Sequence, residues 1–123
     1  MNKTLLRIAA FSGALSVALG AFGAHGLKKI ASPEMVTAFE TGVRYQFYHT
    51  FALLALALLS EKLPARKLKW TAACFIAGIV LFSGSLYLLT ALHATHTVGL
   101  TGIGVLTPVG GVFFIVGWLL LLI

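Results

Sequence analysis

Charge is scarce in this sequence. Asp, Glu, Lys and Arg make up only 10% of its 123 residues, whereas about a quarter of the residues in a typical soluble domain are charged. Hydrophobic residues make up 59% and the mean hydropathy is +1.01. This composition excludes a soluble globular domain, and we expect an integral membrane protein.

Acidic residues and cysteine are scarcer still, with three glutamates, no aspartate and one cysteine. Because Cys74 is alone, an intrachain disulfide and a four-sulfur metal site are excluded. Ser83 and Ser85 lie in an apolar run without the spacing to acid and His that nucleophilic catalysis uses. We therefore expect a non-enzymatic protein with no cofactor.

Long hydrophobic runs are what the chain does contain. A bilayer core about 30 Å thick requires about 20 helical residues per crossing. The sequence predicts an all-α integral membrane bundle, a single domain over residues 1–123, with four transmembrane helices and a Gly/Pro-interrupted fourth element. The predicted spans are about 5–25, 40–60, 70–91 and 100–123.

The first apolar run goes from Leu5 to about Ala24 behind a basic start, a pattern shared with cleaved signal peptides. Its length favours a retained first span. Ser12, Ser16, Gly20 and Ala24 recur every four residues, and small residues at this spacing let helices approach closely in lipid. This seam could pack within the chain or in a dimer.

Ser32, Pro33 and Glu34 form a helix start, with a capping hydroxyl, proline at the first position and a carboxylate in the first turn. We expect one long helix from Pro33 to about Leu59, with its first two turns at the membrane interface.

The basic residues orient the predicted bundle. With four spans, one side receives Lys3, Arg7, Lys62, Arg66, Lys67 and Lys69, and the other receives Lys28, Lys29 and Arg44. An excess of Lys and Arg marks the cytoplasmic side, which predicts that both termini are cytoplasmic. The net charge of +6 is thus assigned to topology and lipid headgroups, and not to nucleic acid.

The last apolar segment is unusually rich in helix-weakening residues: Gly99, Gly102, Gly104, Pro108, Gly110 and Gly111. Thr107 and Pro108 predict that the last regular helix begins at Pro108, with residues 99–106 as a bent extension or a re-entrant loop. We expect the glycines to permit close packing. A helix N-terminus aimed at a ligand anion is the alternative.

A polar segment interrupts the second predicted span. Helical spacing places Glu40, Arg44 and Tyr48 on one stripe and Tyr45 and His49 on the next. Because unpaired charge in hydrocarbon is costly, we expect Glu40 and Arg44 to pair and this face to point into the bundle. The network would fix how the helix docks, or would form a pocket for a proton, ion or small ligand with His49 as the titrating group.

The histidines allow a further comparison. In the predicted topology His25, His49, His93 and His96 all fall towards the outer side. Imidazoles suit several metals, but no acidic partner is obvious beyond Glu40, and we predict no metal site. His25 is retained with the polar-face residues as a ligand candidate, although capping of a helix end is favoured for it.

Four segments resemble a known family: GAFGAHGL from Gly20, FETGVRYQFYHT from Phe39, FSGSLYLL from Phe82 and LTPVGGVFFIVGW from Leu106. They are similar to the signature of the YgdD/YwdK family, domain of unknown function 423. The matching positions are Gly23, His25, Gly26, Tyr45, His49, Gly84, Pro108, Gly110, Gly111 and Trp118. The resemblance implies a small multi-pass protein of the bacterial inner membrane, and implies no activity.

These observations favour an accessory or scaffold protein that binds a lipid, a quinone-like ligand or a protein partner. The alternative is a small transporter or proton-coupled channel that uses the polar face. The expected partners are membrane lipids and a membrane protein or a second copy of the chain.

Overall fold

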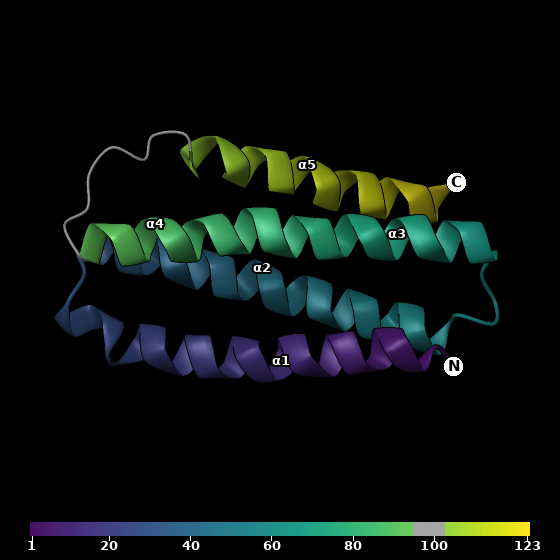
Figure 1. Ribbon diagram of the computed structural model, residues 1–123, viewed down its shortest axis with the longest axis horizontal. Coiled ribbons are helices and arrows are strands. Elements are labelled where there is room, and N and C mark those ends of the chain that lie inside the picture. The colour runs from purple at the N-terminus through teal and green to yellow at the C-terminus, as the bar shows by residue number, and fades with distance from the viewer. Residues whose placement is uncertain (95–102) are drawn as a thin grey trace.

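The computed structural model describes residues 1–94 and 103–123, and every regular element within these ranges is helical. The elements are α1 (Lys3–Ala24), η1 (Leu27–Lys29), α2 (Pro33–Leu58), α3 (Ala65–Gly78), η2 (Ile79–Ser83), α4 (Gly84–Ala94) and α5 (Ile103–Leu122). Since α3, η2 and α4 follow one another without a break, they form one continuous rod, called the third rod. With α1, α2 and α5 it makes a bundle of four antiparallel rods (Figure 1). The prediction of an all-α fold is confirmed.

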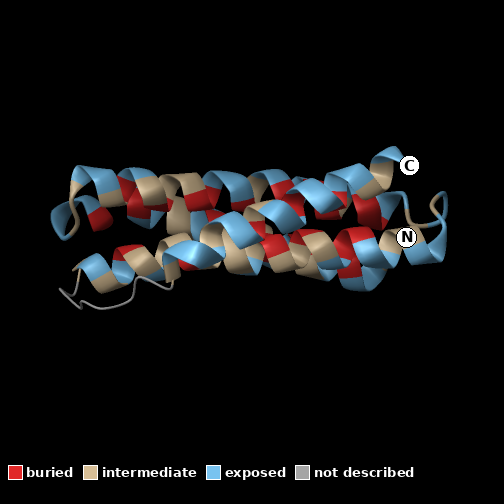
Figure 2. Ribbon diagram, turned by 90° about the horizontal axis from the view of Figure 1, so that it is seen from above, coloured by how far each residue is buried: buried red, intermediate tan, exposed pale blue. Residues whose placement is uncertain are grey.

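Three of these rods are long and apolar enough to cross a membrane: Lys3–Lys29, Ala65–Ala94 and Ile103–Leu122. The rod formed by α2 is not among them, because the polar run from Arg44 to Thr50 lowers its hydropathy. The N- and C-termini lie at the same end of the bundle (Figure 1). Buried positions recur along each rod between exposed ones, so each rod keeps one side for its neighbours (Figure 2).

The second rod begins as the sequence predicts. Ser32 is the N-cap, and its Oγ accepts a hydrogen bond of 3.3 Å from the backbone N–H of Met35. Pro33 occupies the first helical position, where its missing N–H costs nothing. The helix ends at Leu58, one residue before the predicted end.

The small-residue seam of α1 packs against α2 within the chain. Ser12 and Ser16 are buried, and a Cβ on Gly20 would lie 3.5 Å from the Val43 side chain. The seam therefore packs within the molecule, and nothing in this contact supports its alternative use in a dimer. Ala24, the last residue of the seam, is exposed.

The third rod contains a π-helical turn, η2, that the sequence does not announce. It lies between Gly78 and Gly84, and the hydroxyl of Ser83 donates a 2.6 Å hydrogen bond to the carbonyl of Gly42 on α2. Single π-helical turns occur frequently at functional sites. Here the turn contacts both α2 and α5.

The last helix begins at Ile103, so the predicted start at Pro108 is wrong. Proline removes one helical hydrogen bond and crowds the carbonyl four residues earlier. That residue is Gly104, where an added Cβ would meet nothing within 4 Å. The Thr107 hydroxyl also lies 2.6 Å from that of Ser85, which ties this turn to α4. Residues 99–102 of the predicted extension lie outside the described ranges.

Two glycines of α5 explain why this segment is glycine-rich. A Cβ on Gly110 would collide with the backbone of Leu81 and Phe82, and one on Gly117 would lie 2.6 Å from the Phe75 ring. The helices therefore approach at distances that only glycine allows. Among the glycines named in the sequence, the close-packing prediction is confirmed at Gly110, whereas Gly104 has no such contact.

We predict that Gly110→Ala destabilises the bundle by about 1 to 3 kcal/mol, because the methyl group would meet backbone that cannot turn aside. The matched control is Gly104→Ala in the same helix, which should leave stability unchanged or slightly higher. Reversible unfolding in detergent measures both. Equal stabilities for the two variants would contradict this packing.

Candidate functional site

The predicted polar face of α2 divides between the inside and the outside of the bundle. His49 is buried at 4% exposure, whereas Tyr45 and Tyr48 are 37% and 52% exposed. Arg44 is also exposed, and Glu40 is intermediate. The expectation that all five point inward is therefore wrong for Arg44 and Tyr48, whereas the half-exposed ring of Tyr45 packs against Phe82 and Phe114. The covered side of α2 packs against α1 and the third rod, and His49 also contacts Phe114 and Trp118 of α5.

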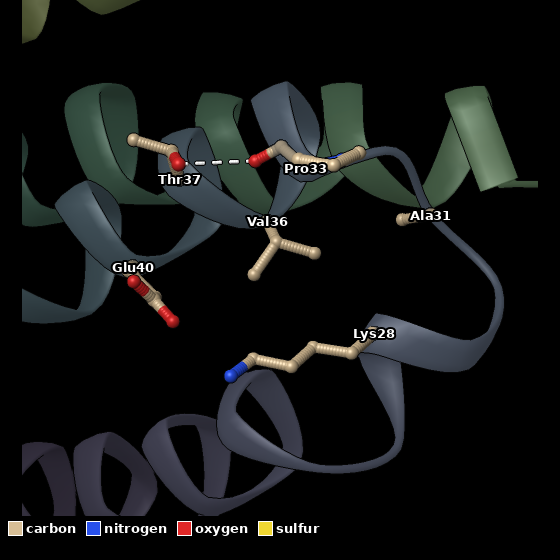
Figure 3. A pocket seen from close by; sticks show the side chains of 6 residues that line it. All are labelled: Lys28, Ala31, Pro33, Val36, Thr37 and Glu40. Atoms are coloured by element: carbon tan, nitrogen blue, oxygen red, sulfur yellow. Dashed lines mark hydrogen bonds between the residues drawn. The ribbon is translucent and has the colours of Figure 1, made fainter.

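The predicted ion pair between Glu40 and Arg44 is not formed either. Within residues 1–94 and 103–123, the one ion pair joins the N-terminal amine of Met1 to Glu61 Oε1 at 3.2 Å. Glu40 instead lines a cavity of about 420 Å³ at the end of the bundle opposite the termini. Lys28 and Glu40 extend into it from opposite walls, while the Thr37 hydroxyl donates to the carbonyl of Pro33 (Figure 3).

A different set of polar side chains meets inside the bundle. Gln46, which is 2% exposed, donates from Nε2 to the carbonyl and the hydroxyl of Ser12, both at 3.2 Å. Its Oε1 accepts a 2.6 Å hydrogen bond from the hydroxyl of Tyr87. The Ser12 and Thr50 hydroxyls lie 2.6 Å apart. This cluster of Ser12, Gln46, Thr50 and Tyr87 links α1, α2 and α4.

The cluster uses all the polar atoms of the Gln46 amide. Its Nε2 donates to two acceptors on Ser12, and its amide oxygen accepts from Tyr87. Sequence reasoning missed this arrangement because it assigned Ser12 to the packing seam and selected charged and aromatic groups on α2. The signal lay in Gln46 and Thr50, which are four residues apart and follow the buried stripe of Phe39 and Val43.

His49 forms a second closed group with residues of α5. Its Nδ1 lies 2.8 Å from the carbonyl oxygen of Tyr45, and its Nε2 accepts a 3.0 Å hydrogen bond from Trp118 Nε1. A carbonyl only accepts, so Nδ1 carries the proton and the imidazole is neutral. The ring stacks on Phe114 with centroids 3.6 Å apart and planes 9° apart. Both nitrogens are thus occupied.

The histidines do not gather on one side. His49 lies in the second half of α2, where its ring contacts Phe75 on α3 and Trp118 on α5. His25 follows the last residue of α1, and its backbone N–H caps that helix by donating to Phe22 at 3.2 Å. No group of three metal-ligating side chains occurs in the described ranges, and His96 lies outside them.

An apolar groove runs along the outside of the buried cluster, between α1 and the third rod. Its volume is about 300 Å³, and one wall includes residues of the π-helical turn. Only Ser12 and Gln46 contribute polar side chains. The lining residues are Ile8, Phe11, Ser12, Leu15, Gln46, Leu53, Ile76, Ile79 and Val80. The lining has the low polarity of a site for part of a hydrocarbon chain.

The rods are apolar, expose many hydrophobic residues, and pack closely at glycine positions. Together with the hydrogen-bonded interior, these features define a helical membrane protein. The family described as protein of unknown function, DUF423, matches residues 19–111. The chain belongs to this family.

Individual relatives are similar over almost the whole chain. The Escherichia coli inner membrane protein YgdD is 41% identical, covering 99% of this chain and 88% of its own length. The Bacillus subtilis membrane protein YwdK is 38% identical, covering 98% and 94% respectively. A Staphylococcus saprophyticus membrane protein of the same group is 39% identical over 98% of this chain. No solved structure matches.

We predict that Trp118→Phe lowers the free energy of unfolding by about 1 to 3 kcal/mol, because the buried Nε2 of His49 loses its donor. Trp70→Phe is the matched control, since Trp70 is 53% exposed, close to the 49% of Trp118, but does not donate to His49. Unfolding in detergent measures both variants. A loss of stability for Trp70→Phe equal to that for Trp118→Phe would contradict the role of the His49 hydrogen bond.

Proposed function

We propose that this protein is a non-enzymatic scaffold of the bacterial inner membrane that binds a lipid through the groove between α1 and the third rod. The observation that carries the proposal is the groove itself, about 300 Å³ of space lined almost entirely by apolar side chains. A soluble metabolite or an ion would gain little there, whereas an acyl chain buries apolar surface.

The bottom of the groove favours a plain hydrocarbon chain over a quinone-like ligand. A quinone head needs hydrogen-bond donors for its carbonyl oxygens. The polar side chains at this surface are Ser12 and Gln46, and the amide nitrogen of Gln46 already donates to Ser12. Breaking these bonds to admit a quinone would leave the buried amide or hydroxyl unsatisfied.

We further propose that all four rods cross the membrane and that both termini are cytoplasmic. In α2, the inward polar groups Gln46, His49 and Thr50 are hydrogen-bonded within the bundle, which lowers the cost of placing them in hydrocarbon. The termini share one end with the basic linker that connects α2 and α3. An excess of basic residues at that end favours its cytoplasmic placement.

The transporter or proton-channel alternative is not favoured by any contact in the described ranges. A proton relay through His49 needs partners that pass a proton on, but Nδ1 faces the backbone carbonyl of Tyr45 and Nε2 faces the indole N–H of Trp118. Translocation along the Gln46 cluster would require breaking its hydrogen bonds at each step. A scaffold function requires neither.

We predict that native mass spectrometry of the mildly solubilised protein finds a bound phospholipid, and that Leu15→Trp reduces this occupancy at least about tenfold by filling the groove. The matched control, Val17→Trp, places the same ring on an exposed position of α1 that does not line the groove. It should retain the lipid. Loss of lipid from both variants, or from neither, would refute the groove as the site.

We predict that single cysteines placed just beyond the two ends of α2 are labelled from opposite sides of the membrane. In a Cys74→Ala background, Lys29→Cys should react with an impermeant thiol reagent added outside intact cells. Lys62→Cys should react only after the membrane is opened. Labelling of both positions from the same side would show that α2 does not cross.

A further inference from the structure

Lys28 and Glu40 line the same cavity but are not paired with each other. The cavity has a volume of about 420 Å³, which is within the range of sites for small molecules. The two charged side chains extend into it from opposite walls, Lys28 from η1 and Glu40 from α2 (Figure 3). Within residues 1–94 and 103–123, no ion pair joins them. The cavity therefore has one positive and one negative wall.

The polar side chains on the α2 wall offer hydrogen-bond acceptors. Thr37 lies three residues before Glu40 and lines the cavity with it. The Thr37 hydroxyl donates its hydrogen to the carbonyl of Pro33 at 3.0 Å, which leaves its oxygen as an acceptor. An ionised carboxylate only accepts. The stem of Glu40 packs on α1, since a Cβ on Gly23 would lie 3.9 Å from Glu40 Cγ. A group that binds at this wall has to donate hydrogen bonds, as an ammonium group does.

The opposite wall offers donors. The ammonium group of Lys28 has three N–H donors and no acceptor, and its charge-assisted hydrogen bonds to phosphate are strong. The remaining lining residues are Ala31, Pro33 and Val36, which carry no polar side-chain atom. Val36 is buried at 7% exposure. The cavity therefore suits a molecule that carries an anionic and a cationic group on a short linker.

The cavity lies at one end of a candidate membrane span. That span runs from Lys3 to Lys29 and includes α1, of which Gly23 is the last residue but one. Glu40 therefore lies beside the last turn of α1, and Lys28 lies at the end of the span. Phospholipid headgroups occupy the layer at the ends of membrane spans. The following inference rests on this span crossing the membrane, and not on the groove between α1 and the third rod.

We propose that this cavity binds the headgroup of a phospholipid that carries both a phosphate and a primary ammonium group, as phosphatidylethanolamine does. The phosphate accepts from Lys28, and the ammonium group donates to Glu40. A phosphatidylglycerol headgroup brings a negative charge without a cation for Glu40, so like charges disfavour it. The site shares no lining residue with the apolar groove. It adds a headgroup-selective site to the proposed lipid-binding scaffold.

The cavity also discriminates between primary and quaternary ammonium groups. A choline group has no N–H to donate to Glu40. Proteins commonly recognise quaternary ammonium groups through aromatic rings. Among the described residues that line the cavity, none is aromatic. Phosphatidylcholine should therefore bind more weakly than phosphatidylethanolamine, although both are zwitterionic.

The proposal is tested by native mass spectrometry of the full chain released from vesicles of phosphatidylethanolamine, phosphatidylcholine and phosphatidylglycerol in equal amounts. The three lipids carry the same acyl chains and are distinguished by mass. The wild-type chain should retain phosphatidylethanolamine at least about threefold more often than either other lipid. Lys28→Gln and Glu40→Gln should each abolish this preference, and Glu40→Gln should also raise the share of phosphatidylglycerol. The matched control, Lys29→Gln, removes an exposed charge of the same element that does not line the cavity, and should keep the preference.

Three results would overturn the proposal. The wild-type chain could retain the three lipids equally. Lys28→Gln could keep the preference, which decides the case even if Glu40→Gln fails to fold, because Lys28 is exposed and lies outside α1 and α2. Lys29→Gln could lose the preference as fully as Lys28→Gln, which would assign it to the general surface charge.

Two further arms separate the source of the headgroup and the groove. Free phosphoethanolamine at the concentration of the lipid should not reduce the preference. Displacement by it would assign the cavity to a soluble zwitterion and overturn the lipid. The measurement is repeated in the Leu15→Trp background, where the groove is filled. Filling the groove changes how many lipids are bound, whereas the Lys28 and Glu40 variants change which lipid is bound. Failure of the groove proposal is thus distinguished from failure of the headgroup site.

Discussion

The bundle depends on the side-chain amide of Gln46. It lies on α2, donates to Ser12 on α1 and accepts from Tyr87 on α4, and so joins three helices at one point. In a bilayer no water replaces a missing partner, so any displacement of one helix leaves a buried amide or hydroxyl unsatisfied. Apolar packing alone does not fix the relative positions of helices in lipid, because lipid tails are as apolar as the side chains. The hydrogen bonds of the Gln46 amide fix the relative positions of α1, α2 and α4.

The packing of α5 on the third rod depends on shape complementarity. Glycines on α5 and on the third rod admit the aromatic rings of the facing helix, as with Gly117 and Phe75 or Gly78 and Phe114. Dispersion contacts at such close approach replace hydrogen bonds as the source of stability. The His49 and Trp118 hydrogen bond connects the two halves, since it joins α2 directly to α5. Stacking of His49 on Phe114 places that polar contact within the region of ring packing.

Much of the fold could be predicted from the sequence, because length, hydropathy and capping residues act locally. The start of α2 at Ser32 and Pro33 is such a case. The start of α5 was wrong because Pro108 is a local signal for a helix start, whereas open space at Gly104 and the hydroxyl contact with Ser85 allow the helix to begin earlier. The π-helical turn could not be foreseen, since it depends on how α2 and α5 pack on the third rod.

The candidate site was predicted only in part, for a related reason. Helical spacing identifies which residues of α2 share a face, but the boundary between inside and outside depends on where α1 and the third rod lie. That boundary passes between Tyr45 and Gln46, so His49 was placed correctly in the interior and its neighbour Tyr48 was not. The predicted pair of Glu40 and Arg44 failed because Arg44 is exposed, while Glu40 extends into the cavity that Lys28 also lines.

Some polar residues of α2 are buried and others are exposed, because one small chain offers few hydrogen-bond partners and counter-charges. Neutral groups such as Gln46, His49 and Thr50 can be satisfied by two or three hydrogen bonds, and four rods provide that number of partners. A guanidinium needs a counter-charge as well, and the interior of this bundle contains none. Burying Arg44 would cost more than the pair with Glu40 returns. The two charges therefore separate: Arg44 is exposed, and Glu40 extends into the cavity that Lys28 also lines.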